Sequence, residues 1–236
     1  MKIYAVAIEN FRGISSTKLV LPDHAVFIGD NNTGKSSVLE AIDLALGPDR
    51  LSRRPPVDEH DFYEGKYLSV APAPAEDGAT PAEPQPAPQI TVEVTIIGLS
   101  EEQEARFGGN IEWLNVETGD FFTEANPAGV DAANIKAALR VTFIGAYDAD
   151  EDDFVGNTYY ARSLTEEETP TPFSKKDKQH CGFLFLRSLR TGSRALSLEH
   201  GSLLDIILRL KEIRPQMWEG TIGTLAAFDV ASDPAI

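Results

Sequence analysis

Runs of β-branched and aromatic side chains recur along this chain, and they predict a domain rich in strands. Residues 2–9 and 90–97 are dense in the side chains that strands favour. Shorter apolar runs predict further strands at 17–21, 24–28, 137–147, 154–162 and 182–186. The runs at 17–21 and 154–162 each follow a short turn. We therefore expect them to return as antiparallel partners of the strands before them.

A helical period replaces this pattern after residue 34. Apolar residues then recur at spacings of three and four, which predicts one buried helix face. The residues of that face are Val38, Leu39, Ala41, Ile42, Ala45 and Leu46. Gly47 and Pro48 follow as a stop signal. Further helices are predicted from Ser100 onward, at 197–212 and at 215–227.

Two segments show neither the strand pattern nor the helical period. Residues 50–67 are polar and contain prolines, so we expect a surface loop there. Residues 71–89 are almost wholly Ala, Pro, Glu, Gln and Gly. Such a composition buries too little apolar area to offset the entropy of ordering, which predicts a flexible insert. The strand pattern resumes at residue 90, so the insert is not interpreted as a domain boundary.

One motif lies between the predicted strand 24–28 and the predicted helix. It fits G-x-x-x-x-G-K-[ST], the phosphate-binding loop, at every fixed position. The predicted nucleotide-binding residues of this loop are Gly29, Asp30, Asn31, Asn32, Thr33, Gly34, Lys35, Ser36 and Ser37. The strand–loop–helix order is the context that the motif requires.

The residue types in the motif suit a nucleoside triphosphate. Gly29 and Gly34 let the backbone turn sharply and approach phosphates without a Cβ clash. Backbone N–H groups and the positive end of the new helix attract the phosphates. Lys35, the candidate catalytic residue, supplies charge for the β- and γ-phosphates, and Ser36 offers a hydroxyl to Mg²⁺. The expected cofactors are therefore ATP and Mg²⁺.

Net charge, apolar content and cysteine count limit the partners and the location expected for this chain. The net charge is −16, from 21 basic and 37 acidic residues, which does not favour nucleic-acid binding. Basic residues still cluster around 50–54, 175–178 and 187–194, where either a local basic surface or ordinary solvated faces is possible. No long apolar run or signal peptide is present, so no membrane contact is expected. The single cysteine, Cys181, excludes an intrachain disulfide and fits a cytoplasmic location.

Other polar clusters are weaker candidates. Residues 148–153 resemble the opening of a calcium loop but lack its glycine and closing glutamate, so a solvated hairpin turn is favoured. Residues 58–61, Asp-Glu-His-Asp, are adjacent in a loop and are not expected to converge on one ion. Hydrolysis also needs an acidic residue at the end of an apolar strand. Neither Asp205 nor Asp229 has a convincing context for that Walker B role.

Four segments together resemble a known family. They are IENFRGI at 8–14, VFIGDNNTGKSSVLEAIDLAL at 26–46, DEHDFY at 58–63 and FLFLRSLRTGSRALSLEHGSLLDIILRL at 183–210. They are similar to the N-terminal part of OLD-family (overcoming lysogenization defect) ATP-dependent endonucleases, which are ABC-type ATPases related to RecF and the SMC proteins. The first block is typical of the whole group, and the last block points to OLD.

This resemblance implies a fold and further parts. The expected fold is α/β, a P-loop NTPase of ABC-ATPase type whose mixed sheet begins with antiparallel strands. Residues 1–236 would be the N-terminal part of that ATPase domain. By the resemblance, Arg12 approaches the nucleotide phosphates. Family members continue with an ABC signature, Walker B, a switch histidine and a Toprim nuclease domain, none of which is recognisable here. A truncated chain, a fragment or one part of a split protein is therefore expected.

The expected function is an ATP- and Mg²⁺-binding part of an OLD-like DNA endonuclease. DNA as a partner is implied by the resemblance alone. Full-length relatives pair their ATPase heads, so a homodimer or a partner chain is expected to complete the site. Two alternatives stay open: a nucleotide-gated, non-catalytic interaction subunit, and an SMC- or RecF-like ATPase of DNA repair.

Overall fold

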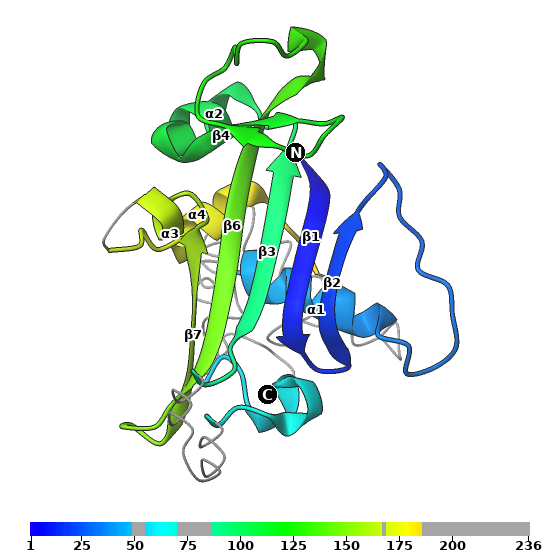
Figure 1. Ribbon diagram of the computed structural model, residues 1–236, viewed down its shortest axis with the longest axis vertical. Coiled ribbons are helices and arrows are strands. Elements are labelled where there is room, and N and C mark those ends of the chain that lie inside the picture. Colours follow the sequence, from blue (N-terminus) through cyan, green and yellow to red (C-terminus); the bar gives the residue numbers. More distant parts are fainter. Residues whose placement is uncertain (49–54, 70–85, 167–168, 186–236) are drawn as a thin grey trace, which may run out of the picture. The chain divides into compact units, whose positions relative to one another are not determined.

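The structure is a computed structural model that describes residues 1–48, 55–69, 86–166 and 169–185 (Figure 1). The chain divides into two compact units, Met1–Phe183 and Leu184–Ile236. The strands of the first unit are β1 (Lys2–Phe11), β2 (Ile14–Val20), β3 (Ile90–Ile97), β4 (Ile111–Asn115), β5 (Phe121–Phe122), β6 (Ile135–Asp148) and β7 (Asp153–Tyr160). Its α-helices are α1 (Lys35–Leu46), α2 (Glu101–Phe107), α3 (Ser163–Glu166) and α4 (Lys175–Cys181).

The seven strands form one antiparallel sheet, in which six follow the order β2-β1-β3-β6-β4-β5 and β7 pairs with β6 outside this order. The long strand β6 is paired twice along its outer edge. Its first half pairs with β4, in the register Leu139 opposite Ile111, and its second half pairs with β7, with Val141 opposite Tyr160. The expected hairpins β1–β2 and β6–β7 are confirmed.

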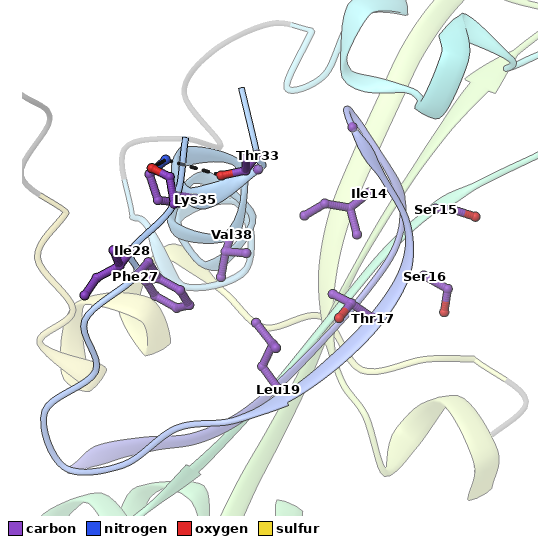
Figure 2. Close-up of a pocket in the computed structure, with 13 residues that line it drawn as sticks. Ile14, Ser15, Ser16, Thr17, Leu19, Phe27, Ile28, Thr33, Lys35 and Val38 are labelled. Carbon is purple, nitrogen blue, oxygen red and sulfur yellow. Dashed lines mark hydrogen bonds between the residues drawn. The ribbon is translucent and has the colours of Figure 1, made fainter. Parts of the chain in front are cut away.

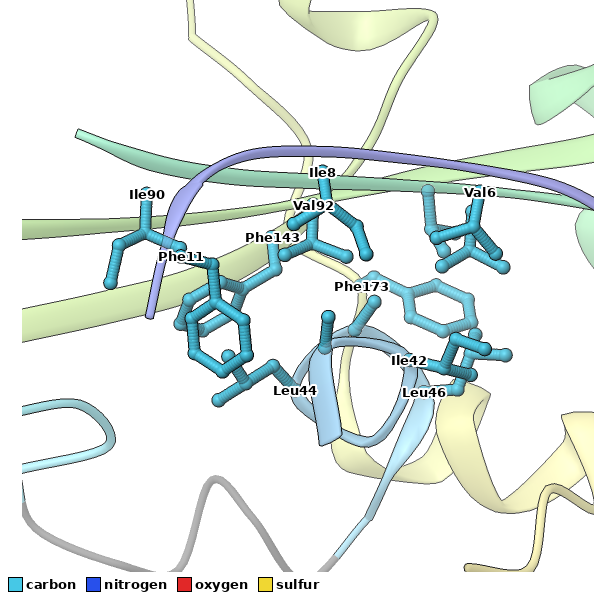
Figure 3. Close-up of a cluster of buried hydrophobic side chains, with 14 of the residues drawn as sticks. Val6, Ile8, Phe11, Ile42, Leu44, Leu46, Ile90, Val92, Phe143 and Phe173 are labelled. Atoms are coloured by element: carbon cyan, nitrogen blue, oxygen red, sulfur yellow. The ribbon is translucent and has the colours of Figure 1, made fainter. Parts of the chain in front are cut away.

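Helix α1 packs on one face of this sheet (Figure 3). Side chains alternate between the two faces of a strand, so every second residue points at the helix. The sheet contributes Val6, Ile8, Phe11, Ile90, Val92, Val94, Ile96, Leu139, Val141 and Phe143 to the core. The helix contributes Val38, Ala41, Ile42, Leu44, Ala45 and Leu46, and Figure 3 shows the Phe173 ring between Val6 of the sheet and Ile42 of the helix.

The predicted helix is confirmed with one change in its buried face. It ends at Leu46, immediately before the Gly47-Pro48 stop. Leu44 is fully buried, whereas Leu39, which was expected in the buried face, is 43% exposed. The helix expected after Ser100 is also confirmed. The Ser100 side chain accepts a hydrogen bond from the N–H of Gln103, which caps α2.

The predicted strand at 24–28 is wrong. Residues 24–28 form no strand, and Val26 and Ile28 are 80% and 90% exposed. An apolar strand of this kind needs neighbours on both sides of a sheet. The part of the chain that the structure describes supplies no neighbour for this segment. The expected antiparallel start of the sheet is confirmed, but a mixed sheet is not found among the described strands, because every pairing between them is antiparallel.

The expectation of a surface loop at 50–67 is only partly correct, since residues 49–54 lie outside the described residues. In the rest, Val57, Asp61 and Phe62 are buried, and Phe62 forms an isolated β-bridge with Phe11. Short 3₁₀ helices at Glu59–Asp61 and Tyr63–Gly65 replace an open loop. The segment is therefore docked on the end of β1.

The predicted strand at 182–186 is also wrong where it can be examined. Residues 182–185 form no strand; α4 ends at Cys181, and Gly182, with φ +64°, caps the end of the helix. A capping box between Ser174 and Asp177 starts that helix. The predicted helices at 197–212 and 215–227 lie outside the described residues, as does most of the predicted insert; residues 86–89 have no regular structure.

Candidate functional site

The motif forms a loop that leads directly into α1. Gly34 is the residue before the helix and has φ +85°, a left-handed conformation that side chains other than glycine adopt with strain. No side chain caps this end of the helix, and no acidic residue lies in its first turn. The first backbone N–H groups of a helix have no partner within it. The start of α1 therefore offers these donors to an anion.

Lys35 turns back into its own loop. Its Nζ donates to the carbonyl oxygens of Gly29, at 2.9 Å, and Asp30, at 2.6 Å. A third contact, at 3.3 Å, joins it to Oγ1 of Thr33, which itself donates to the Asp30 carbonyl at 2.9 Å (Figure 2). The ammonium group thus lies among the loop residues that the motif assigns to phosphate.

An open hollow of about 550 Å³ adjoins this loop. One wall comes from the β1–β2 hairpin, residues 13–17 with Leu19, and the other from residues 27–29, 33–35 and Val38. Figure 2 shows Ile14 and Leu19 of the hairpin facing Phe27 and Val38. The hollow joins an apolar part to the polar loop, and its volume is within the range of small-ligand sites.

The donor set fits a triphosphate with a magnesium ion. Backbone N–H groups and one lysine suit phosphate oxygens, and the exposed hydroxyl of Ser36, in the first turn of α1, suits a hard cation. Asp30, Asn31, Asn32 and Thr33 are exposed along the loop, and Ser37 is half-buried in the helix. The structure therefore brings all nine predicted loop residues into one turn and the start of one helix.

Arg12 lies elsewhere. It follows β1, does not line the hollow, and is engaged by two carboxylates. Its Nε donates to Asp61 Oδ1 at 2.9 Å, and its Nη1 lies 2.7 Å from Glu40 Oε2. Burial opposes the charged form of the guanidinium, but the bond to Asp61 and the charge of Glu40 raise the pKa of Arg12 overall.

These two acidic partners were not identified from the sequence. Asp61 belongs to the polar segment 58–61, in which it was considered only as a metal ligand. The structure uses it to accept from Arg12 and from the backbone N–H of Asp58. Glu40 is one of the polar positions of α1, and no local pattern distinguishes it. No pattern in the sequence pointed to either contact, because both depend on how distant segments pack around the half-buried Arg12.

The other polar clusters considered in the sequence form hydrogen bonds within their own segments or do not converge. In the turn 148–153, Asp148 accepts from the N–H of Asp150, and the Tyr147 hydroxyl donates to Asp152. Among the described residues, no group of three or more His, Cys, Asp and Glu side chains converges as metal ligands would. Within the same residues, no helix is long and apolar enough to cross a membrane.

Comparison with known families agrees with this geometry. The family model of the AAA ATPase domain matches residues 1–183, which is the extent of the first compact unit. The chain belongs to the AAA ATPase domain family. Membership implies nucleotide binding. The resemblance to P-loop ATPases is thereby confirmed at the level of this family.

Individual relatives match a shorter stretch. Proteins of Mycobacterium bovis and Mycobacterium tuberculosis, both described as uncharacterized, are 46% identical to this chain over 48 residues. Those residues make up 20% of this chain and 6% of each relative, so the relatives are about three times as long. The chain therefore matches only a small part of these proteins, and their descriptions assign no substrate.

Proposed function

We propose that residues 29–37 bind the triphosphate of ATP together with Mg²⁺. The observation that carries this proposal is the placement of Lys35. Its Nζ lies on the carbonyls of Gly29 and Asp30, beside the uncapped start of α1. A phosphate at this helix end would meet the lysine and the free N–H donors together, while Ser36 would hold the metal. Mg²⁺ there would neutralise charge on the phosphates.

The wider role follows from the sequence resemblance and stays part of the proposal. The chain would be the nucleotide-binding part of an OLD-like ATP-dependent DNA endonuclease, with the nuclease supplied outside these residues. DNA binding and pairing with a second ATPase head would accompany that role. The phosphate contact of Arg12 that the resemblance implies stays a prediction, since its printed partners are two carboxylates.

A non-catalytic, nucleotide-gated subunit is a second candidate, and one observation favours it. Among the residues that the structure describes, none of those that line the hollow carries a carboxylate. Hydrolysis needs a group that positions the attacking water. The purified chain alone is therefore expected to bind nucleotide but to turn it over slowly or not at all. A turnover near one per second would contradict this expectation.

Calorimetric titration of Mg²⁺-ATPγS tests the binding proposal. The wild-type chain should bind, and Lys35→Ala should lose most of that affinity. Lys18→Ala is a matched control, because Lys18 is an exposed lysine of the neighbouring strand β2 and does not line the hollow. Equal affinity in wild type and Lys35→Ala, or no binding by the folded wild type, would overturn the proposal.

A further inference from the structure

Arg12 ties three elements of the domain together. It occupies the turn between β1 and β2, and its guanidinium reaches Glu40 on α1 and Asp61 in the 3₁₀ helix Glu59–Asp61. Its backbone N–H also donates to the Asp61 carbonyl, at 2.8 Å. Both the main chain and the side chain of one residue thus hold the same partner. This double attachment fixes the position of the turn.

The turn is also a wall of the nucleotide hollow. Gly13 and Ile14, the two residues after Arg12, line it. A Cβ placed on Gly34 would lie 3.7 Å from the Ile14 side chain, so the hairpin lies close beside the phosphate loop. Moving the turn would therefore change the space beside the loop. Arg12 itself lies outside this space, because it is not among the lining residues.

The charges around Arg12 argue against its being free to bind phosphate. One guanidinium faces two carboxylates, so the group has no surplus positive charge. Asp61 is only 3% exposed at its side chain, whereas Arg12 and Glu40 are 31% and 25% exposed. Withdrawing Arg12 would leave a buried carboxylate without its ion pair, which is strongly unfavourable. A phosphate would have to compete with that cost.

We propose that Arg12 is a positioning residue of the nucleotide pocket, which acts through Glu40 and Asp61 to hold the β1–β2 turn against the phosphate loop. The inference rests on the proposed function, since it concerns the same pocket. It differs from a direct phosphate contact in one testable respect. The two carboxylates would assist nucleotide binding here, whereas they would compete with it if Arg12 bound phosphate.

Glu40→Gln separates these two roles. It keeps the size of the side chain and removes the charge that pairs with Arg12. For a positioning role, Mg²⁺-ATPγS binding should weaken about three- to tenfold, in the same direction as in Arg12→Gln. The double variant Arg12→Gln/Glu40→Gln should bind no more weakly than the single variant with the lower affinity, because both substitutions break the same ion pair between Arg12 and Glu40. The titrations are run at a temperature where all variants are folded, as checked by circular dichroism.

Glu9→Gln is the matched control. Glu9 is an exposed acid of β1 without a contact to Arg12, so it reports the effect of removing one negative charge near the site. A methylanthraniloyl-ATP probe adds a reading of the pocket wall, and its emission should change in Glu40→Gln but not in Glu9→Gln. Rescue is tested with Arg12→Lys, which should recover part of the affinity through one remaining ion pair.

The outcomes are distinct. Unchanged or tighter binding by Glu40→Gln, or additive effects in the double variant, would overturn the positioning role and leave the proposed function intact. Absence of binding by the wild-type chain would overturn the proposed function, and the inference with it. Weaker binding by Glu40→Gln, non-additive with Arg12→Gln and absent in Glu9→Gln, is the expected result.

Discussion

Lys178 donates a hydrogen bond from Nζ to the carbonyl oxygen of Leu44, over 3.1 Å, although its side chain is completely buried. This contact fastens α4 to the last turn of α1, where a positive charge complements the helix dipole. Burial disfavours the charged amine and lowers the pKa of Lys178 to about 7, against the opposing charge of Asp43. Cys181, which also raises the pKa of Lys178, lies on α4 itself.

The lowered pKa predicts a pH-dependent stability. In the unfolded chain a lysine titrates near 10.4, so between about pH 7 and pH 10 the unfolded chain binds more protons than the folded one. The free energy of unfolding should therefore rise with pH above 7, with a slope of at most about 1.4 kcal/mol per pH unit from this group. Below pH 7 both states are protonated, and the burial penalty is present in full.

Urea unfolding of wild type and Lys178→Met between pH 6 and pH 8.5 measures this contribution. The wild type should gain about 1 to 2 kcal/mol relative to the variant from pH 7 to pH 8.5. Lys176→Met, an exposed position on the same helix, should follow the wild-type slope. Parallel curves for wild type and Lys178→Met would show that Lys178 does not titrate in this range.

The contacts of Arg140, on the face of the sheet opposite α1, lead to a second prediction about the free energy of unfolding. It contacts both carboxylate oxygens of Glu112, at 2.8 and 3.0 Å, and stacks 4.3 Å from the Phe121 ring centre. The Glu112 side chain is only 8% exposed. Arg140→Met leaves this carboxylate without its partner and should lower the free energy of unfolding by about 2 to 4 kcal/mol.

Lys66→Met is the comparison for Arg140→Met. Lys66 also forms an ion pair, with Glu64, but both side chains are more than half exposed. An exposed pair is screened by water and contributes little. Urea midpoints of the two variants should therefore differ clearly, with Lys66→Met close to wild type. Similar midpoints would mean that the Arg140 pair is no more important than a surface pair.

Ser36 predicts a metal-specific loss of affinity. If its hydroxyl binds Mg²⁺, Ser36→Ala should weaken ATPγS binding in magnesium to the level that the wild type shows in EDTA. The affinity in EDTA should not change, since Lys35 and the loop N–H groups stay in place. Ser36→Thr keeps the hydroxyl, which the motif permits, and should restore the magnesium effect. An equal loss with and without magnesium would assign Ser36 to the phosphates or to loop shape.

Local patterns predicted the parts of this fold that depend on neighbours in sequence. Strands β1, β3 and β6, the two hairpins and α1 follow from periodicity and turns. The failures at 24–28 and 182–185 have a common cause. An apolar run reports a preference for burial, and it becomes a strand only where another strand is present to pair with it. Strands β4 and β5 are short and were not predicted.

The candidate site also has one part that the sequence predicted and one part that it did not. The motif predicted the loop because Gly34, Lys35 and Ser36 act through their own backbone and immediate neighbours. The Arg12 contacts join residues separated by 49 positions in the case of Asp61. No local period specifies such a pair, since it depends on how the segment 55–67 docks on β1. Three-dimensional structure was needed to find it.

Gly156 predicts a packing effect that the sequence does not reveal. It lies opposite Gly145 in the β6–β7 hairpin, against the buried ring of Phe143. A Cβ at this position would lie 2.6 Å from Phe143 Cζ and 3.1 Å from Pro56 Cγ. Because the ring is enclosed by the core, it has little room to move. Gly156→Ala should lower the free energy of unfolding by about 1 to 3 kcal/mol.

Two further variants identify the clash as the cause. Gly109→Ala meets open space and should leave the urea midpoint near wild type. Phe143→Leu shortens the side chain that the new methyl group would strike. Although it is destabilising alone, combining it with Gly156→Ala should cost less than the sum of the two single changes. Additive losses would show that Gly156 is required for its backbone conformation and not for the space that Phe143 fills.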